Sequence, residues 1–231
     1  MLIWAILLAL LPGLAWLIFY LQEDLHPEPK SLLAAVFVTG GAFAFFALAL
    51  QIIMQKFGVL DPGDAVAHNS FWIFPLSLFL FSLTEEFFKF AAAYVNVRRK
   101  EDFDEPIDAM IYVVVAGLGF ATIENIGTIT PGMGEAVNLS LAFQTLSLRF
   151  IGATLLHALT AGIVGYYWAV SIRDFELKRY LVFGLVLAAA LHAFFNYLII
   201  NFSDLIYALV FLLIIGFFVL HDFERLKLKS I

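Results

Sequence analysis

Seven long apolar segments constrain this chain more than any other feature of its sequence. They cover approximately residues 1–21, 32–54, 70–97, 107–130, 142–171, 180–200 and 204–220. A helix needs roughly 20 mostly apolar residues to cross about 30 Å of hydrocarbon. A spanning backbone must also satisfy its own hydrogen bonds, which a helix does within one segment. The sequence therefore predicts an all-α polytopic membrane protein with about seven transmembrane helices.

The composition agrees with this prediction and excludes other classes of protein. Apolar residues make up 63% of the 231 residues and charged residues 14%, whereas a soluble domain usually has about 45–50% and about 25%. The chain has no cysteine, so disulfides and thiolate metal sites are excluded. The net charge of −6 offers no basic surface for nucleic acid. We therefore expect contacts with the lipid bilayer and none with nucleic acid.

Lysine and arginine residues between the segments predict the orientation of the chain, because cytoplasmic loops retain these residues. Ten of them fall on one side in alternating loops, and the other side holds only Lys56. We expect an integral protein of the cell membrane with its N-terminus outside and its C-terminus in the cytoplasm. The ten residues are Lys30, Arg98, Arg99, Lys100, Arg173, Lys178, Arg179, Arg225, Lys227 and Lys229.

Ionisable side chains deep inside the apolar segments mark a candidate site. A charged side chain at the bilayer centre costs at least about 2.5–3.5 kcal/mol on insertion scales. Counted from the cytoplasmic ends at about 1.5 Å per residue, Glu86, His192, His157 and Glu124 lie roughly 16, 18, 21 and 25 Å deep. We therefore expect the third to sixth helices to bring polar groups together near the midplane. The deep residues are Glu85, Glu86, Lys89, Glu124, Arg149, His157 and His192.

The spacing of these residues predicts some of their partners. Lys89 lies four residues after Glu85 and three after Glu86, so it can reach either carboxylate. This group can also be read as a neutralised structural ion pair. Glu124 has no cation within one helical turn, so it needs a partner on another helix, a proton or water. We expect Arg149 to snorkel toward the outer face in a structural role.

Four short motifs, in chain order, carry a resemblance to a known family. They are EExxK at residues 85–89, FxxxE ending at Glu124, a segment around His157, and HxxxN at residues 192–196. With these motifs the chain resembles the PrsW family of glutamic-type intramembrane proteases. That family belongs with the CAAX-prenyl-protease and bacteriocin-processing membrane proteins. The resemblance covers most of the chain and implies an intramembrane endopeptidase.

The residue types suit hydrolysis by an activated water. The chain has no cysteine, and no serine with a nearby histidine and acid stands out, which disfavours an acyl-enzyme. Carboxylates and histidines instead suit direct attack by water. We expect Glu85 or Glu86 to take the proton, helped by Glu124 or His157; the sequence leaves open which glutamate is the base. We further expect Lys89 to keep one of the pair ionised, and His192 and Asn196 to donate hydrogen bonds to the oxyanion.

The expected architecture follows from this assignment. We predict a single transmembrane protease domain over residues 1–231, with no internal repeat or soluble domain. Residues 1–69 would form two N-terminal helices, residues 70–200 the four-helix catalytic core, and residues 201–231 a C-terminal helix and cytoplasmic tail. The expected substrate is a membrane protein with a single transmembrane helix, because the cleaved stretch must unwind. The resemblance implies a membrane anti-sigma factor as one such substrate.

Two alternatives assign a different chemistry to the same residues. Hydrolysis by a water that carboxylates activate requires no cofactor. Zinc could nevertheless bind with an open position, because enough N and O donors are offered by Glu86, Glu124, His157 and His192. No HExxH motif is present, so the ligands would come from separate helices. The second alternative is a proton-coupled transporter, in which deep carboxylates and histidines are also common. A membrane scaffold without chemistry is the remaining alternative.

Overall fold

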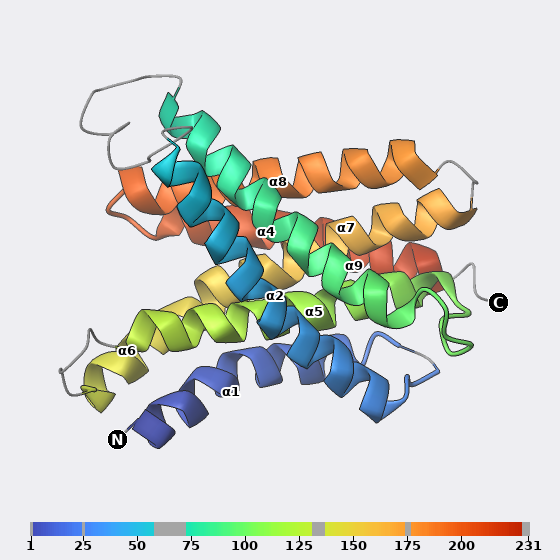
Figure 1. Cartoon of the computed structure of the whole chain (residues 1–231), viewed down its shortest axis with the longest axis horizontal. Coiled ribbons are helices and arrows are strands. Elements are labelled where there is room, and N and C mark those ends of the chain that lie inside the picture. The colour runs from blue at the N-terminus through green and yellow to red at the C-terminus, as the bar shows by residue number, and fades with distance from the viewer. Residues whose placement is uncertain (1, 25, 58–72, 131–136, 174–176, 228–231) are drawn as a thin grey trace.

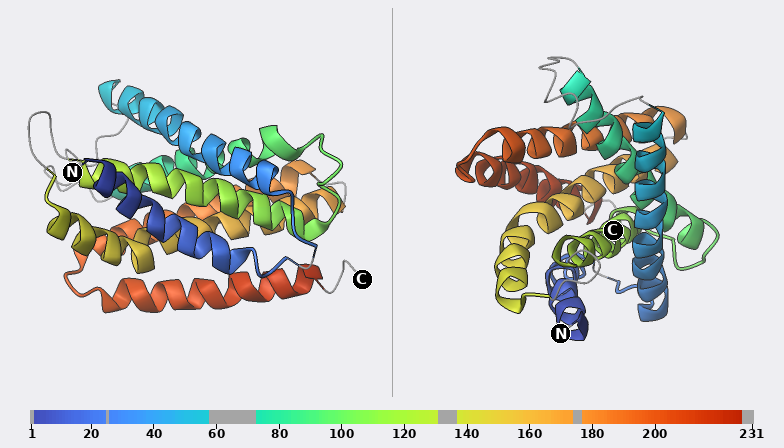
Figure 2. Two further views of the ribbon diagram at one scale, coloured as in Figure 1. Left: turned by 90° about the horizontal axis from the view of Figure 1, so that it is seen from below. Right: turned by 60° about the vertical axis from the view of Figure 1, so that its left-hand side comes forward.

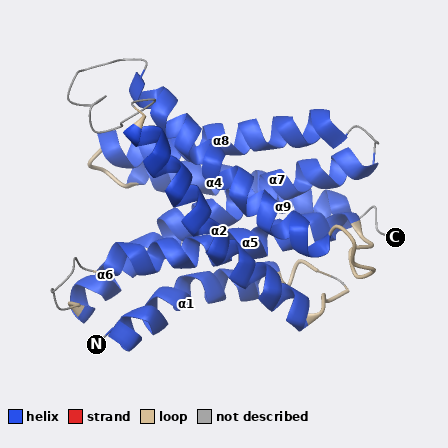
Figure 3. Cartoon of the chain, in the orientation of Figure 1, coloured by secondary structure: helices blue, strands red, loops and turns tan. Residues whose placement is uncertain are grey.

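Helices make up the whole of the described secondary structure. The computed structural model describes residues 2–24, 26–57, 73–130, 137–173 and 177–227. Within these residues there is no strand, as Figure 3 shows, which confirms the all-α prediction. In chain order the elements are α1 (Leu2–Tyr20), α2 (Lys30–Lys56), α4 (Ile73–Val97), α5 (Pro106–Ile129), α6 (Leu139–Arg149), the π-helical segment η1 (Phe150–Thr154), α7 (Leu155–Arg173), α8 (Leu177–Asn201) and α9 (Ile206–Lys227).

The helices agree closely with the seven predicted spans. Six of them are long and apolar enough to cross a bilayer by length and composition, counting α6, η1 and α7 as one continuous helix. The remaining helix, α4, has 25 residues and contains three charged side chains. The last predicted span was too short, because α9 continues to Lys227 into the expected tail. The predicted turns at 61–64 and 131–134 lie outside the described residues.

Helix α5 forms the centre of the bundle. Most of its residues are buried, and it packs against α1, α2, α4 and α7. A helix that is apolar on all sides is expected to be enclosed in this way. Seen from below, α2 and α9 lie on opposite sides of the bundle, with α5 and α7 between them (Figure 2, left). In Figure 1, α2 and α4 cross the other helices obliquely.

Glycines allow α2 to cross very close to α5. A Cβ atom on Gly119 would overlap the carbonyl oxygen of Phe37, and one on Gly40 would overlap the carbonyl oxygen of Ala116. Small residues at helix crossings permit close backbone approach within membranes. On another face of α5, Gly117 faces the carbonyl oxygen of His157 at 3.0 Å from an added Cβ. The glycines therefore bring both α2 and α7 near the middle of α5.

Ion pairs join several loops at one end of the bundle. Lys227, the last residue of α9, lies 2.5 Å from Glu23 in the α1–α2 loop. His26 of the same loop lies 2.7 Å from Glu105, which precedes α5. Helix α1 begins at the opposite end from the one where α9 ends (Figure 1). This arrangement agrees with an odd number of crossings.

Candidate active site

The middle of α4 supplies three of the predicted site residues. The buried stripe of α4 runs through Ser82, Glu86, Lys89, Ala93 and Val97, a spacing of three and four residues that lines one helical face. Glu86 and Lys89 are both fully buried. Charged groups are buried at such depth only when they are paired. The stripe therefore points a lysine and a carboxylate into the bundle rather than toward lipid.

Lys89 is the centre of a buried network. Its Nζ donates to Glu86 Oε1 at 2.6 Å and to Thr160 Oγ1 at 3.2 Å. It also lies 3.2 Å from His157 Nδ1. Of the two carboxylates that Lys89 could reach by spacing, the structure pairs it with Glu86. An ammonium can only donate hydrogen bonds, so His157 Nδ1 accepts and its Nε2 carries the proton.

Glu124 receives its partners from one continuous helix. His157 Nε2 lies 2.9 Å from Glu124 Oε2, and Arg149 Nη2 lies 3.3 Å from the same oxygen. Arg149 Nε also donates to Asn125 Oδ1 at 2.6 Å. Glu124 therefore finds partners on another helix, as its sequence context required. The predicted snorkelling of Arg149 is wrong, because its guanidinium turns toward the site and not toward the outer face.

His192 connects the two adjacent glutamates of α4. Its Nδ1 lies 2.7 Å from Glu86 Oε1, and its Nε2 lies 3.5 Å from Glu85 Oε2. Glu85 also accepts a hydrogen bond of 3.0 Å from Gln51 Nε2 of α2. The rings of His157 and His192 meet edge to face, with centroids 5.1 Å apart. The two histidines thus join Glu85, Glu86 and Glu124 into a single cluster.

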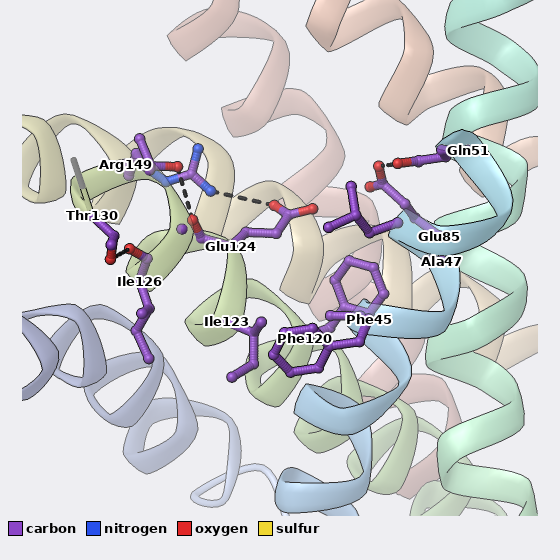
Figure 4. A pocket seen from close by; sticks show the side chains of 14 residues that line it. Phe45, Ala47, Gln51, Glu85, Phe120, Ile123, Glu124, Ile126, Thr130 and Arg149 are labelled. Carbon is purple, nitrogen blue, oxygen red and sulfur yellow. Dashed lines mark hydrogen bonds and ion pairs between the residues drawn. The ribbon is translucent and has the colours of Figure 1, made fainter. Parts of the chain in front are cut away.

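A cavity of about 630 Å³ opens beside this cluster, between α2, α5 and α6. Glu85 and Glu124 both line it, and Figure 4 shows Glu124 extending across it toward Glu85. Glu86 does not line it. Arg149 lies at one end of the cavity and Gln51 at the other (Figure 4). The apolar lining consists of Ala44, Phe45, Ala47, Leu48, Phe120, Ile123, Ile126 and Gly127.

Asn196 lies near the cluster but is not joined to it. It is one helical turn beyond His192 on α8 and half-buried. Within the part of the chain that the structure describes, no hydrogen bond holds its side-chain amide. Its predicted role as an oxyanion donor therefore stays a prediction.

Three of the site residues could hold a metal ion. Glu85, His157 and His192 each offer a ligand atom, and these atoms lie within 4.8 Å of one another. The sequence-based set differs, since it had Glu86 and Glu124 in place of Glu85. In the structure these two carboxylates instead contact the histidines, Glu86 at His192 Nδ1 and Glu124 at His157 Nε2. Carboxylates in that position commonly orient metal-binding histidines.

Comparison with known proteins decides the family. The model of a family described as "PrsW family intramembrane metalloprotease" matches residues 28–221, which is most of the chain. The chain belongs to the PrsW family. It is therefore an intramembrane peptidase, which confirms the predicted resemblance and removes the transporter and scaffold alternatives.

Relatives of the PrsW family match over nearly the same length. The Protease PrsW of Geobacillus kaustophilus is 28% identical over 191 residues, covering 82% of this chain and 76% of the relative. That of Oceanobacillus iheyensis is 28% identical over 222 residues, covering 95% and 94%. That of Bacillus subtilis is 28% identical over 202 residues, covering 85% and 83%. No solved structure gives a significant match.

The donor set of this PrsW-family chain fits the metal that the family description implies. Two nitrogen ligands and one oxygen ligand suit zinc with one open coordination position, provided that His157 releases Lys89 from Nδ1 or Glu124 from Nε2. Glu86 Oε2 is buried and has no hydrogen-bond partner among the described residues. The three carboxylates also outnumber the two basic side chains, Lys89 and Arg149, by one, an excess that a metal ion or a proton could balance. These observations favour an additional cation at the cluster.

Several residues around the site were missed by the sequence analysis. Gln51 lies near the polar end of a span, where an amide carries no special signal. Asn125 follows Glu124 and bonds to Thr154, a contact that depends on how α5 packs against η1. Thr160 is one of several hydroxyl residues in apolar helices. Arg149 was noticed in the sequence, but its contact with Glu124 was not predicted. Its signal was usable, because it is a cation inside a span and Glu124 lacked a cation on its own helix.

Proposed function

We propose that this PrsW-family protease cleaves a membrane-anchored protein by attack of a water held between Glu85 and Glu124. The observation that carries the proposal is that these two carboxylates, from α4 and α5, line the same cavity. Glu86 is fully buried and bound to Lys89 and His192, so it holds site residues in place without lining the cavity. Two carboxylates on one cavity supply a base for the water and afterwards an acid for the leaving amine.

The proposed reaction needs only groups that face the cavity or lie next to it. The water oxygen bonds to the scissile carbonyl carbon while one proton passes to Glu85 or Glu124. The carbonyl electron pair moves onto its oxygen, where Asn196 donates a hydrogen bond, and His192 Nε2 does so when both ring nitrogens carry protons, because Nδ1–H already donates to Glu86. Oxyanion donors of this kind are worth about 2.7–4 kcal/mol each. The carbon–nitrogen bond then breaks, and the protonated carboxyl group returns its proton to the amine.

Lys89 is proposed as a positioning residue in this reaction. It holds Glu86 at 2.6 Å and faces His157 Nδ1 at 3.2 Å. Glu86 in turn binds His192, which contacts Glu85 at the cavity, and His157 binds Glu124, which lines it. Lys89 therefore orients the two histidines without contacting the substrate.

A zinc ion is the cofactor that the donor set would accept. Glu85, His157 and His192 would hold it, and it would supply a Lewis acid for the scissile carbonyl. Glu124 would then be the free carboxylate on the cavity and would take the proton of the water. With zinc bound the acid–base work would therefore fall to Glu124 alone, whereas without zinc both carboxylates that line the cavity share it.

The expected substrate has one transmembrane helix with a stretch that unwinds easily. Carbonyl groups of an intact helix are bonded internally, so the cleaved segment must open before attack. Phe45 and Leu48 of α2 line the cavity and are largely exposed on the bundle surface, at 60% and 53%. They provide an apolar entrance for an unwound segment. A membrane anti-sigma factor is one substrate of this class.

The proposed orientation has the N-terminus outside and the C-terminus in the cytoplasm. The bundle end that carries Lys227 and the loops before α2 and α5 would then face the cytoplasm. This follows from the ten lysine and arginine residues on that side. Labelling of single cysteines introduced at Glu101 and at Thr130 would test it, with Glu101 expected to react only from inside.

Cleavage assays with glutamine variants test the site assignment. The probe is a single-span model protein with a Gly-Pro pair in its transmembrane helix, reconstituted with the protease in liposomes. We expect Glu85→Gln and Glu124→Gln to insert normally and to cleave at least about 100-fold more slowly, the usual loss for acid–base catalysis. His157→Ala should also be inactive. Glu101→Gln, an exposed loop variant, is the control. Full activity of both glutamine variants, or no cleavage by the wild-type protein, would contradict the proposal.

A chelator distinguishes the metal-dependent form of the reaction. If zinc is held by Glu85, His157 and His192, a zinc chelator should abolish cleavage and added zinc should restore it. Zinc content measured on the purified protein should fall in His192→Ala. Cleavage that is unchanged by the chelator, with no zinc in the purified protein, would leave the carboxylates acting alone.

A further inference from the structure

The helix that carries His157 is interrupted by a π-helical turn directly after Arg149. Residues Phe150–Thr154 form this segment, η1, between α6 and α7. A π turn leaves one backbone carbonyl without its regular partner, and such turns often occur at functional sites. Here the indole Nε1 of Trp16 in α1 donates to the carbonyl oxygen of Phe150 at 2.8 Å. The two rings also stack with centroids 5.3 Å apart. The interruption is therefore held in place by a second helix.

The π turn changes which residues share a face. Arg149 and His157 are eight residues apart, which in a regular α-helix of 3.6 residues per turn rotates them by about 80°. A π turn takes up one extra residue, so the pair is rotated like residues seven apart, by about 20° in the other direction. Both side chains then point to the same side. In agreement, both contact Glu124 Oε2, His157 at 2.9 Å and Arg149 at 3.3 Å.

Arg149 contacts two consecutive residues of α5. Its Nη2 contacts Glu124 Oε2 and its Nε donates to Asn125 Oδ1 at 2.6 Å. Asn125 in turn donates to Thr154 Oγ1, in the last residue of η1, at 3.2 Å. The planar guanidinium fixes direction as well as distance, which a lysine would not do. The hydrogen bonds therefore close a loop from Arg149 through α5 and back to η1.

This arrangement occupies one oxygen of Glu124 and leaves the other available. Arg149 and His157 both hold Oε2, and among the described residues no hydrogen bond reaches Oε1. Glu124 lines the cavity, with its side chain about one-third exposed at 31%. The free oxygen therefore faces the space that the substrate would enter.

We propose that Arg149 is a positioning residue. The π turn places its side chain next to Glu124, and Arg149 holds this carboxylate with Oε1 facing the water. The proposal rests on the proposed role of Glu124 at the cavity. Its effect is on the chemical step, because Arg149 acts on the orientation of a carboxylate that takes part in the reaction. A shift of about 1 Å in such a group can cost about 100-fold in rate.

Variants of Arg149 test this role with the liposome-bound model protein described above. We expect Arg149→Gln to lower kcat by about 10- to 100-fold with KM changed less than about 3-fold. Arg149→Lys should recover part of the lost kcat, since an ammonium keeps the charge at Glu124 but loses the fork to Asn125. Arg99→Gln, which removes an exposed arginine, is the matched control. All kcat values are divided by the amount of folded protease. That amount is measured before reconstitution, as the protein that stays soluble in detergent after heating.

Trp16→Phe tests the π turn without touching the site. It removes the N–H that binds the Phe150 carbonyl and keeps an aromatic ring for the stack. We expect a lowered kcat in the same direction as Arg149→Gln and an unchanged KM. Trp4→Phe is the control, because Trp4 is 63% exposed on the same helix.

The outcomes separate this inference from the proposed function. Full kcat in Arg149→Gln together with an inactive Glu124→Gln would overturn the role of Arg149 and leave the site assignment intact. A rise in KM alone would also overturn it, since Arg149 would then bind substrate. If Arg149→Lys recovered no kcat, loss of the positive charge beside Glu124 would be ruled out as the cause of the lower kcat. A fully active Glu124→Gln would instead overturn the proposed function itself.

Discussion

Lys89 is a cation with no exposed surface, deep among apolar helices. A lone ammonium at this position would be very unfavourable, so its hydrogen bonds to Glu86 and Thr160 are a condition of the fold. Glu86 depends on Lys89 and His192 in the same way. Each side chain is therefore tolerated only because the others are present.

Removing the lysine should expose this dependence. We expect Lys89→Met to lower the free energy of unfolding by about 3–5 kcal/mol, because it leaves the Glu86 carboxylate buried without its cation. The double variant Lys89→Met/Glu86→Gln should regain most of that loss. Chemical unfolding in mild detergent would measure both. Lys56→Met, at an exposed lysine, serves as the control, and a single variant as stable as this control would contradict the argument.

Asn196 provides a test at the same scale that concerns activity. Its amide is half-buried, one turn from His192, and unbound within the described chain. If it donates to the oxyanion, Asn196→Ala should lower kcat by about 100- to 1000-fold, the effect of removing one such donor. The midpoint of unfolding should not change, because no bond in the resting protein is lost. Equal kcat values for both proteins would remove Asn196 from the mechanism.

Among the elements, the crossing of α2 over α5 determines the shape of the cavity. Helix α2 supplies Gln51 to Glu85 and forms part of the apolar lining. The crossing depends on Gly119, where an added Cβ would overlap the backbone of α2 at Phe37. Backbone cannot move aside as a flexible side chain can. The distance between these two helices therefore depends on the absence of a side chain at Gly119 and, on the facing helix, at Gly40.

Gly119→Ala should separate α2 from α5. We expect a loss of about 1–3 kcal/mol in the free energy of unfolding, the usual effect of overpacking. Cleavage should fall as well, because Gln51 moves away from Glu85. Gly127→Ala, on the same helix, is the control for stability alone, since nothing lies within 4 Å of an added Cβ there but Gly127 lines the cavity. Similar behaviour of both variants would show that the crossing tolerates a methyl group.

The sequence predicts elements better than it predicts how they face one another. Long apolar runs and loop charges were enough for the seven helices, since these depend on composition along the chain. The partner of Glu124 and the choice of Glu86 by Lys89 depend on helix rotation, which composition does not determine. The η1 turn takes up one extra residue, which brings Arg149 onto the same side of the helix as His157. The η1 segment contains no proline that would mark it in the sequence. Arg149 was therefore misplaced although it was noticed.

At the scale of the whole molecule, one end of the bundle is closed by acidic loop residues. Glu28, before α2, accepts a hydrogen bond from the Tyr112 hydroxyl of α5. Asp24 accepts from the backbone N–H of His26 at 3.0 Å, and both carboxyl groups are buried. Burial raises the pKa of Asp24 and of Glu28 above their ordinary values, although these hydrogen bonds partly oppose the shift. The folded protein therefore holds protons here more tightly than the unfolded chain.

This end of the bundle should make stability depend on pH. Because the folded-state pKa values of Asp24 and Glu28 are raised, their contribution to stability is fully present below the ordinary carboxyl pKa of about 4. It is lost as the pH rises through the raised values. We expect Glu28→Gln, which needs no proton to stay buried, to flatten this decline in thermal unfolding measured across pH. Glu101→Gln is the exposed control, and identical pH profiles for wild type and Glu28→Gln would contradict the expectation.

The exposed aromatic and aliphatic lining at Phe45 and Leu48 has a kinetic consequence. A partner that enters past these side chains arrives sideways, by diffusion within the plane of the lipid. Encounter frequency then follows the number of partners per lipid molecule and not their molarity in the aqueous phase. Fusing empty vesicles into a proteoliposome preparation should therefore slow turnover by surface dilution, even though every bulk concentration is held constant.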